Sequence, residues 1–112
     1  MMLVKDIKDK FDFKVVAGEK GLNNEVKGLY CCDLLSWVMS HAKERDAWIT
    51  VQTHINIVAI ASLLNLACII VPEAIEVDED TIEKANEENI TIFSTDLDNF
   101  RIFSKFYEAG MR

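Results

Sequence analysis

The sequence predicts a three-layer α/β fold, with a mainly parallel sheet of about five strands and helices on both faces. Short apolar segments alternate with helical patterns from residue 47 to the end of the chain. The apolar segments lack polar alternation, which is typical of parallel strands covered on both faces and joined by right-handed crossovers. With one proline and four glycines in 112 residues, the chain has few long loops. We therefore expect a single domain spanning residues 1–112.

The individual elements follow from hydrophobic periodicity and from helix-capping residues. The predicted helices cover residues 4–11, 34–43, 55–66, 79–89 and 97–109. The predicted strands cover residues 14–17, 26–32, 47–51, 68–71 and 90–93. Asp33, Thr53 and Asp78 are the expected N-caps, because their side-chain oxygens can accept the free N–H groups of a first helical turn. In the last helix, Phe100, Phe103 and Tyr107 share one face at i, i+3 and i+7.

The longest apolar stretch, residues 55–71, does not predict a membrane span. It contains Asn56, Ser62 and Asn65 and ends at Pro72, so it falls short of the roughly 20 apolar residues that a span requires. It instead predicts a helix buried on more than one side, followed by a buried strand. Charged residues also interrupt the N-terminal apolar stretch at residues 5 and 6, unlike a signal peptide. We expect a cytoplasmic protein with no membrane contact.

Charge and cysteine content narrow the function classes further. The formal net charge is −7, and a surface of this sign repels phosphate backbones, so we expect no nucleic acid partner. The three cysteines, Cys31, Cys32 and Cys68, do not form a disulfide framework. Neither His41 nor His54 has a metal-ligating partner one helical turn away. We therefore expect no metal site and no cofactor.

Polar residues gather by topology where the predicted parallel strands end. Ligands of open parallel sheets bind outside these carboxyl ends, beside the N-termini of helices. The expected binding residues are Asp33, Gln52, Thr53, His54, Glu73, Ser94, Thr95 and Asp96. A small anion or the edge of an adenine nucleotide is the ligand class that suits them. The simpler interpretation is that Thr53 and Thr95 only cap helices, since every helix has N–H groups to satisfy.

Catalysis has weaker support in the sequence. His54, with Asp33 and Cys32, could serve a small transferase or hydrolase acting at the strand ends, but no spacing rule supports that arrangement. The segment 18–21, GEKG, lacks the GxxxxGK[ST] spacing of a phosphate loop, and neither GxGxxG nor GxSxG occurs. We therefore expect an accessory module rather than an enzyme, with no catalytic residues.

The second predicted helix has more apolar surface than one contact with a sheet would bury. Aromatic residues and methionine are enriched in the cores of protein interfaces. The expected interface residues are Tyr30, Leu34, Trp37, Val38, Met39 and Trp48, with core packing as the alternative for each. Together with the apolar helix at residues 55–66, this surplus predicts a homodimer or a protein partner.

Four segments resemble DRTGG domains of the short, stand-alone type. They are GEKGLNNEVKG at residues 18–28, DAWIT at 46–50, ACIIVP at 67–72 and NITIF at 89–93. The chain differs from the family signature at two places: Gln52-Thr53-His54 stands where Asp-Arg-Thr is expected, and Glu73-Ala74 stands where paired glycines are expected. Both differences remove groups that an anion site would use, namely a bidentate cation and a closely approaching backbone.

This resemblance implies a fold and a class of role. DRTGG domains are similar to the N-terminal domain of HPr kinase/phosphorylase, and they occur beside CBS pairs in regulated pyrophosphatases and in phosphotransacetylases. The phosphate-binding loop of HPr kinase lies in a separate domain, so the resemblance does not imply serine kinase activity. It implies a regulatory, ligand-sensing or dimerising module.

Overall fold

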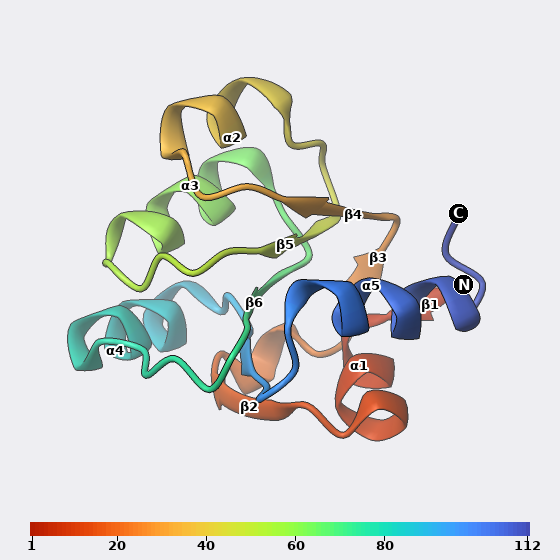
Figure 1. The fold of residues 1–112 in the computed structure, drawn as a ribbon. Coiled ribbons are helices and arrows are strands. Elements are labelled where there is room, and N and C mark those ends of the chain that lie inside the picture. The colour runs from red at the N-terminus through yellow and green to blue at the C-terminus, as the bar shows by residue number, and fades with distance from the viewer.

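A five-stranded sheet separates two layers of helices, as predicted (Figure 1). The computed structural model describes residues 1–112. The sheet has the order β2-β7-β6-β5-β4, in which β4 to β7 are parallel and β2 runs antiparallel to β7. Its strands are β2 (Lys14–Ala17), β4 (Gly28–Cys31), β5 (Asp46–Ile49), β6 (Cys68–Val71) and β7 (Ile92–Ser94). The helices are α1 (Val4–Phe11), α2 (Leu35–His41), α3 (Asn56–Leu64), α4 (Glu79–Glu88) and α5 (Asn99–Glu108).

The sheet buries side chains on both faces, in two separate core clusters. Trp48 and Ile69 point to the face covered by α2, α3 and α4, where Val38, Ile57 and Ala85 pack against them. Their neighbours along the strands point to the other face, against side chains of α1 and α5. Every residue of β5 and β6 is buried, which explains why these strands are apolar without alternation from Ala47 onward. Asp46, the first residue of β5, is the exception, and its carboxylate accepts a hydrogen bond from Lys43 N–H.

A small second sheet was not predicted. The segment expected as one strand at residues 26–32 divides at Lys27. Its first part forms β3 (Glu25–Val26), which pairs antiparallel with β1 (Met2–Leu3), and its second part forms β4 of the main sheet. Two-residue strands show no periodicity, so tertiary pairing alone defines them. A short 3₁₀ helix, η1 (Glu19–Gly21), precedes β3.

The caps of three helices differ from the predictions. Helix α2 begins after Leu34 and α3 after Ile55, and neither has a side-chain cap. Asp78 is the N-cap residue of α4, but its carboxylate accepts no hydrogen bond from that helix. Asp33 and Thr53, expected as caps, bind other partners. At the start of α5 the Asp98 side chain accepts from the Arg101 N–H group, and at the start of α1 the Asp6 carboxylate accepts from Leu3 N–H.

The two ends of the chain lie side by side, next to β1 and the end of α5 (Figure 1). Met2 and Met111 both line one cavity of about 580 Å³ between them. No helix of the chain is both long and apolar enough to span a bilayer.

Candidate functional site

The four parallel strands end at a common edge of the sheet. We call this edge the strand-end rim, and it consists of Asp33, residues 50–54, residues 72–74 and residues 94–96. The register is continuous across it, because Cys31 pairs with Ile49, Ile49 with Ile70, and Ile70 with Phe93. The backbone continues this alignment beyond the strands. Thr50 N–H donates to Ile70 O, and Thr95 N–H donates to Val71 O. The rim predicted from topology is therefore present.

Asp33 ties the ends of β4 and β5 together. Its Oδ1 accepts hydrogen bonds from the Thr50 hydroxyl and from Val51 N–H, each at 2.9 Å. The Gln52 side chain donates to Asp33 O at 3.1 Å, and Gln52 N–H donates to the Thr50 hydroxyl. Asp33 and Gln52 thus lie together as predicted, although their polar atoms are largely engaged with each other and with the backbone.

Thr53 connects the rim to the start of α4 instead of capping α3. Its hydroxyl donates to Asp78 Oδ1 at 3.2 Å, and its carbonyl accepts from the buried Thr81 hydroxyl at 2.7 Å. These bonds explain why neither Thr53 nor Asp78 makes a capping bond to the helix that follows it. This pairing joins positions 25 residues apart, which local sequence patterns do not reveal.

The turn after β6 has an unusual backbone conformation. Glu73 and Ala74 have φ values of 59° and 55°, and Ile75 N–H donates to Pro72 O at 3.2 Å. Two left-handed central residues define a type I′ turn, which normally uses glycine or asparagine. The turn is held against the end of β7, because Glu73 N–H donates to Leu97 O and Ala74 N–H donates to Thr95 O.

The remaining predicted rim residues differ in burial. Thr95 is buried and its hydroxyl accepts from Leu97 N–H at 3.2 Å, so it acts as a local turn cap. Ser94 is half-buried at the end of β7, whereas His54 and Asp96 are exposed. His54 Nδ1 accepts from Asn56 N–H at 3.2 Å. No hydrogen bond joins His54 to Asp33, so the geometry of a paired base and carboxylate is not formed.

The rim presents carboxylates, amides and hydroxyls, but no lysine or arginine. Asp33, Glu73 and Asp96 contribute negative charge, and Asp78, Glu79 and Asp80 add more at the start of α4. The N-termini of nearby helices carry partial positive charge, which attracts anions to such an edge. The carboxylates of the rim counteract that attraction. The rim is therefore better suited to hydrogen-bonding a neutral ring edge than to holding phosphate.

No group of three or more histidine, cysteine, aspartate or glutamate side chains is arranged to hold a metal ion. All three cysteines are free. Complete burial raises the pKa of the Cys68 thiol far above its ordinary value. Burial also raises the pKa of the Cys31 thiol, and the nearby charges of Asp33 and Cys32 add to the effect. These two thiols are therefore poor nucleophiles at neutral pH.

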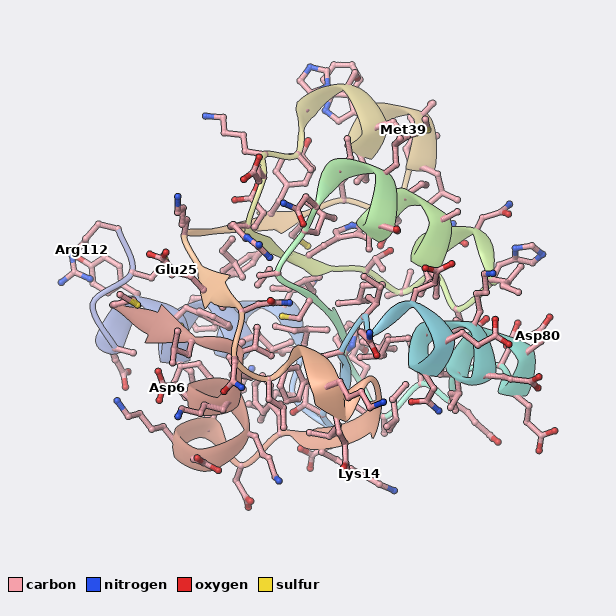
Figure 2. All side chains as sticks on the ribbon, turned by 180° about the vertical axis from the view of Figure 1, so that it is seen from behind. Asp6, Lys14, Glu25, Met39, Asp80 and Arg112 are labelled. Carbon is pink, nitrogen blue, oxygen red and sulfur yellow. The ribbon has the colours of Figure 1, made fainter.

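The predicted interface residues separate into surface and core. Leu34, Trp37 and Met39 are 62%, 51% and 47% exposed, and Met39 lies at the outer end of the molecule in Figure 2. Trp37 stacks on His41, with ring centroids 3.9 Å apart. Val38 and Trp48 are fully buried within the chain, so including them in an interface was wrong. The Trp48 indole N–H donates to Cys32 O at 2.9 Å, which satisfies its polar group inside the core.

A second exposed apolar surface lies on α5 and was not predicted from the sequence. Phe100, Phe103 and Tyr107 are 71%, 39% and 60% exposed, whereas Ile102 and Phe106 are buried. The aromatic series at i, i+3 and i+7 therefore marks the outer face of α5 and not its core face. The i, i+4 spacing of Ile102 and Phe106 is the sequence signal for the buried face. The aromatic series at i, i+3 and i+7 is the more regular pattern, although it marks the exposed face.

Three comparisons with known proteins bear on this geometry. The model of the DRTGG domain family matches residues 6–109. A comparison with curated proteins gives no match. A similar solved structure contains the CBS and DRTGG domains of the regulatory region of Clostridium perfringens pyrophosphatase, in complex with its activator, diadenosine tetraphosphate. The TM-score is 0.67 at 20% sequence identity, over 91% of this chain and 44% of that chain. The chain thus spans less than half of the solved relative, and since the family model covers nearly all of its residues, it belongs to the DRTGG domain family.

Proposed function

We propose that the chain is a non-catalytic regulatory module that works as a homodimer. The observation that carries this proposal is the DRTGG match over residues 6–109, combined with a structural relative that is part of the regulatory region of an enzyme. The likeness to HPr kinase/phosphorylase concerns the fold alone, and we assign no phosphoryl transfer to the chain. We place the module in the cytoplasm, where three free thiols stay reduced.

For the ligand, we propose an adenine nucleotide recognised mainly through its base. The pyrophosphatase region binds an activator with two adenosine groups. On the rim, Gln52 and His54 offer an amide and an imidazole that can bond to the edge of a purine, whereas no lysine or arginine is present for phosphates. Affinity should therefore depend little on the number of phosphate groups.

Thermal unfolding in the presence of AMP, ADP, ATP, diadenosine tetraphosphate, inorganic phosphate and acetyl phosphate tests the ligand. A ligand at about 100 times its dissociation constant stabilises the folded state by about 2.7 kcal/mol, which raises the melting temperature. We expect a rise with the adenine compounds that is lost in Gln52→Ala/His54→Ala and kept in Glu19→Ala, far from the rim. An unchanged melting temperature with every compound would reject ligand sensing and leave protein interaction as the role.

For the homodimer, we propose that a second copy covers the exposed apolar side chains of α2 and its N-cap residue, together with the half-buried Tyr30 of β4. Tyr30, Leu34, Trp37 and Met39 form this surface. Light scattering coupled to size-exclusion chromatography gives the mass directly, and Trp37→Ser should shift the population toward monomer. Leu63→Ser is the matched control, because Leu63 is equally apolar and 69% exposed on α3. A monomer at micromolar concentration in the unaltered protein would reject the dimer.

A further inference from the structure

We infer that a second copy of this chain adds to the open edge of β4, so that two β4 strands pair antiparallel across a twofold axis and the two sheets become one. This inference rests on the proposed homodimer and specifies how it forms. The main sheet has two edges, because β4 pairs only with β5, and β2 pairs only with β7. Each edge therefore leaves one row of backbone N–H and C=O groups without a strand partner.

The two edges differ in their protection against pairing. Strand β2 begins at the exposed Lys14 and has an irregular register between Val15 and Ala17. A charged residue and a bulge are the usual features that prevent an edge from pairing. Strand β4, Gly28-Leu29-Tyr30-Cys31, contains no charge and no proline, and its register with β5 is regular throughout. Figure 2 shows Lys14 at the end of the molecule opposite α2 and Met39.

The register with β5 identifies the free backbone groups of β4. Pairing runs from Gly28↔Asp46 to Cys31↔Ile49, and Cys32 N–H donates to Ile49 O at 3.3 Å. Because hydrogen-bonding direction alternates along a strand, Tyr30 points its backbone groups toward β5. Leu29 and Cys31 then point their N–H and C=O groups out of the open edge.

One antiparallel register uses all of these free groups. Leu29 lies opposite Cys31 of the second copy and Cys31 opposite its Leu29, which gives two hydrogen-bonded pairs around a central Tyr30–Tyr30 pair. The same register brings Lys27, the residue before β4, near Asp33 of the second copy, two residues after β4, and Asp33 near its Lys27. Lys27 N–H donates to Arg45 O, so this contact would join side chains and not backbone. Shifting the register either way leaves one free residue unpaired and separates these charges. Lys27 is exposed without an ion-pair partner, and Asp33 Oδ2 accepts no bond within the chain.

Apolar surface beside the edge supports the same arrangement. Leu29 and Cys31 point to the α5 face of the sheet. A cavity of about 270 Å³ there connects Leu29 with Phe103 and Tyr107 of the exposed α5 surface. In the proposed register Cys31 of the second copy lies opposite Leu29, so its side chain borders this cavity and covers apolar surface that the single chain leaves to solvent.

Disulfide cross-linking tests the register. A hydrogen-bonded antiparallel pair has Cα atoms about 5.5 Å apart, within the range of a disulfide. Leu29→Cys should therefore form a covalent dimer with the native Cys31 of the second copy under mild oxidation, seen on a non-reducing gel. The control variant Leu29→Cys/Cys31→Ser lacks the predicted partner thiol. It keeps the native Cys32, which lies outside the paired residues, so it should not form a cross-linked dimer. Equal cross-linking in both variants would overturn the register.

Charge reversal tests the same contact without cysteine. Lys27→Glu places like charges together at two symmetric positions, so the dimer dissociation constant should rise about tenfold or more. Lys27→Glu/Asp33→Asn should recover most of the loss, because the amide oxygen keeps the bonds to Thr50 and Val51 without the negative charge. Lys14→Glu, the same change on the β2 edge, should leave the dissociation constant unchanged.

The outcomes separate this inference from the proposed function. A monomeric unaltered protein would reject both the proposed homodimer and the pairing through β4. A dimer in which Leu29→Cys does not cross-link and Lys27→Glu binds as tightly as the unaltered chain would reject pairing through β4 alone, and would leave the exposed α2 side chains as the dimer contact.

Discussion

The Asp33 carboxylate accepts a hydrogen bond from the Thr50 hydroxyl at 2.9 Å, across the carboxyl ends of β4 and β5. The same oxygen accepts from Val51 N–H. These bonds fix where the chain leaves β5 and enters the rim, so they determine the path of residues 51–54. A residue that looks like a helix cap in sequence therefore acts as a clamp between two strands.

Removing this clamp should destabilise the domain. We expect Asp33→Ala to lower the free energy of unfolding by about 1–2 kcal/mol, because two hydrogen bonds to a charged acceptor are lost at an exposed position. Chemical denaturation measures the change. Asp33→Asn, which keeps the acceptor oxygen, should lose less than half as much. The control Asp96→Ala should change stability by less than about 0.5 kcal/mol, since the Asp96 carboxylate makes no hydrogen bond. An equal loss in Asp33→Ala and Asp96→Ala would contradict the clamp.

Glycine should improve the turn after β6. Ala74 has a φ of 55°, and an L-residue with a side chain pays about 1–2 kcal/mol in this region. We expect Ala74→Gly to raise the free energy of unfolding by about 1 kcal/mol, less than the full strain because glycine also gains entropy in the unfolded chain. Ala59→Gly, in the exposed face of α3, should lower it by about 1 kcal/mol. A loss of stability in both variants would show that the turn is not strained.

The same substitution should destabilise the domain much more at Trp48 than at Trp37. Trp48→Phe removes buried volume and leaves Cys32 O without its indole donor, so we expect a loss of about 2 kcal/mol in the free energy of unfolding. Trp37→Phe changes an exposed ring and should cost less than about 0.5 kcal/mol in the monomer. Measurements well below the dimer dissociation constant isolate this effect. A larger loss for Trp37→Phe would contradict the burial assigned to each ring.

Stability should fall in alkaline solution because of Cys68. Its pKa is raised above the ordinary value of 9.0 by burial, so the unfolded chain releases this proton at a lower pH than the folded one. The neutral, buried thiol contributes its full stabilisation below the pKa of the thiol in the unfolded chain. This stabilisation is lost as the pH rises from that pKa toward the higher pKa of the folded chain. Between about pH 8 and about pH 10 the free energy of unfolding should drop by about 1 kcal/mol more than in Cys68→Ala. Denaturation under reducing conditions measures both proteins; parallel pH profiles would refute the assignment.

Continuous local patterns were sufficient to predict most of the fold. Helix α1 and strands β2 and β6 have the predicted bounds, because each has a clear apolar period and a defined stop. The parallel order of β4 to β7 followed from alternating strands and helices. The small β1–β3 sheet could not be predicted, since its pairing depends on α1 bringing residues 2 and 26 together.

The site was less predictable, because its contacts join distant positions. Topology located the rim, but the bonds of Thr53 to Asp78 and of Asp33 to Thr50 required three-dimensional packing. The left-handed turn at Glu73 and Ala74 lies where family members are expected to have paired glycines, so the backbone retains a conformation that these side chains do not favour. In α5, the aromatic series Phe100, Phe103 and Tyr107 faces solvent. Amphipathic spacing therefore identifies the residues that share a helix face, but it does not show whether that face is buried or exposed.

The adjacency of the two chain ends has a consequence for how such a domain can be used. Because residues 2 and 111 border the same cavity, a host protein could accept the whole unit between two consecutive residues of a surface loop without stretching its own backbone. Joining the ends with a short peptide and opening the chain elsewhere, for example in the exposed segment 43–44, should likewise preserve the native topology.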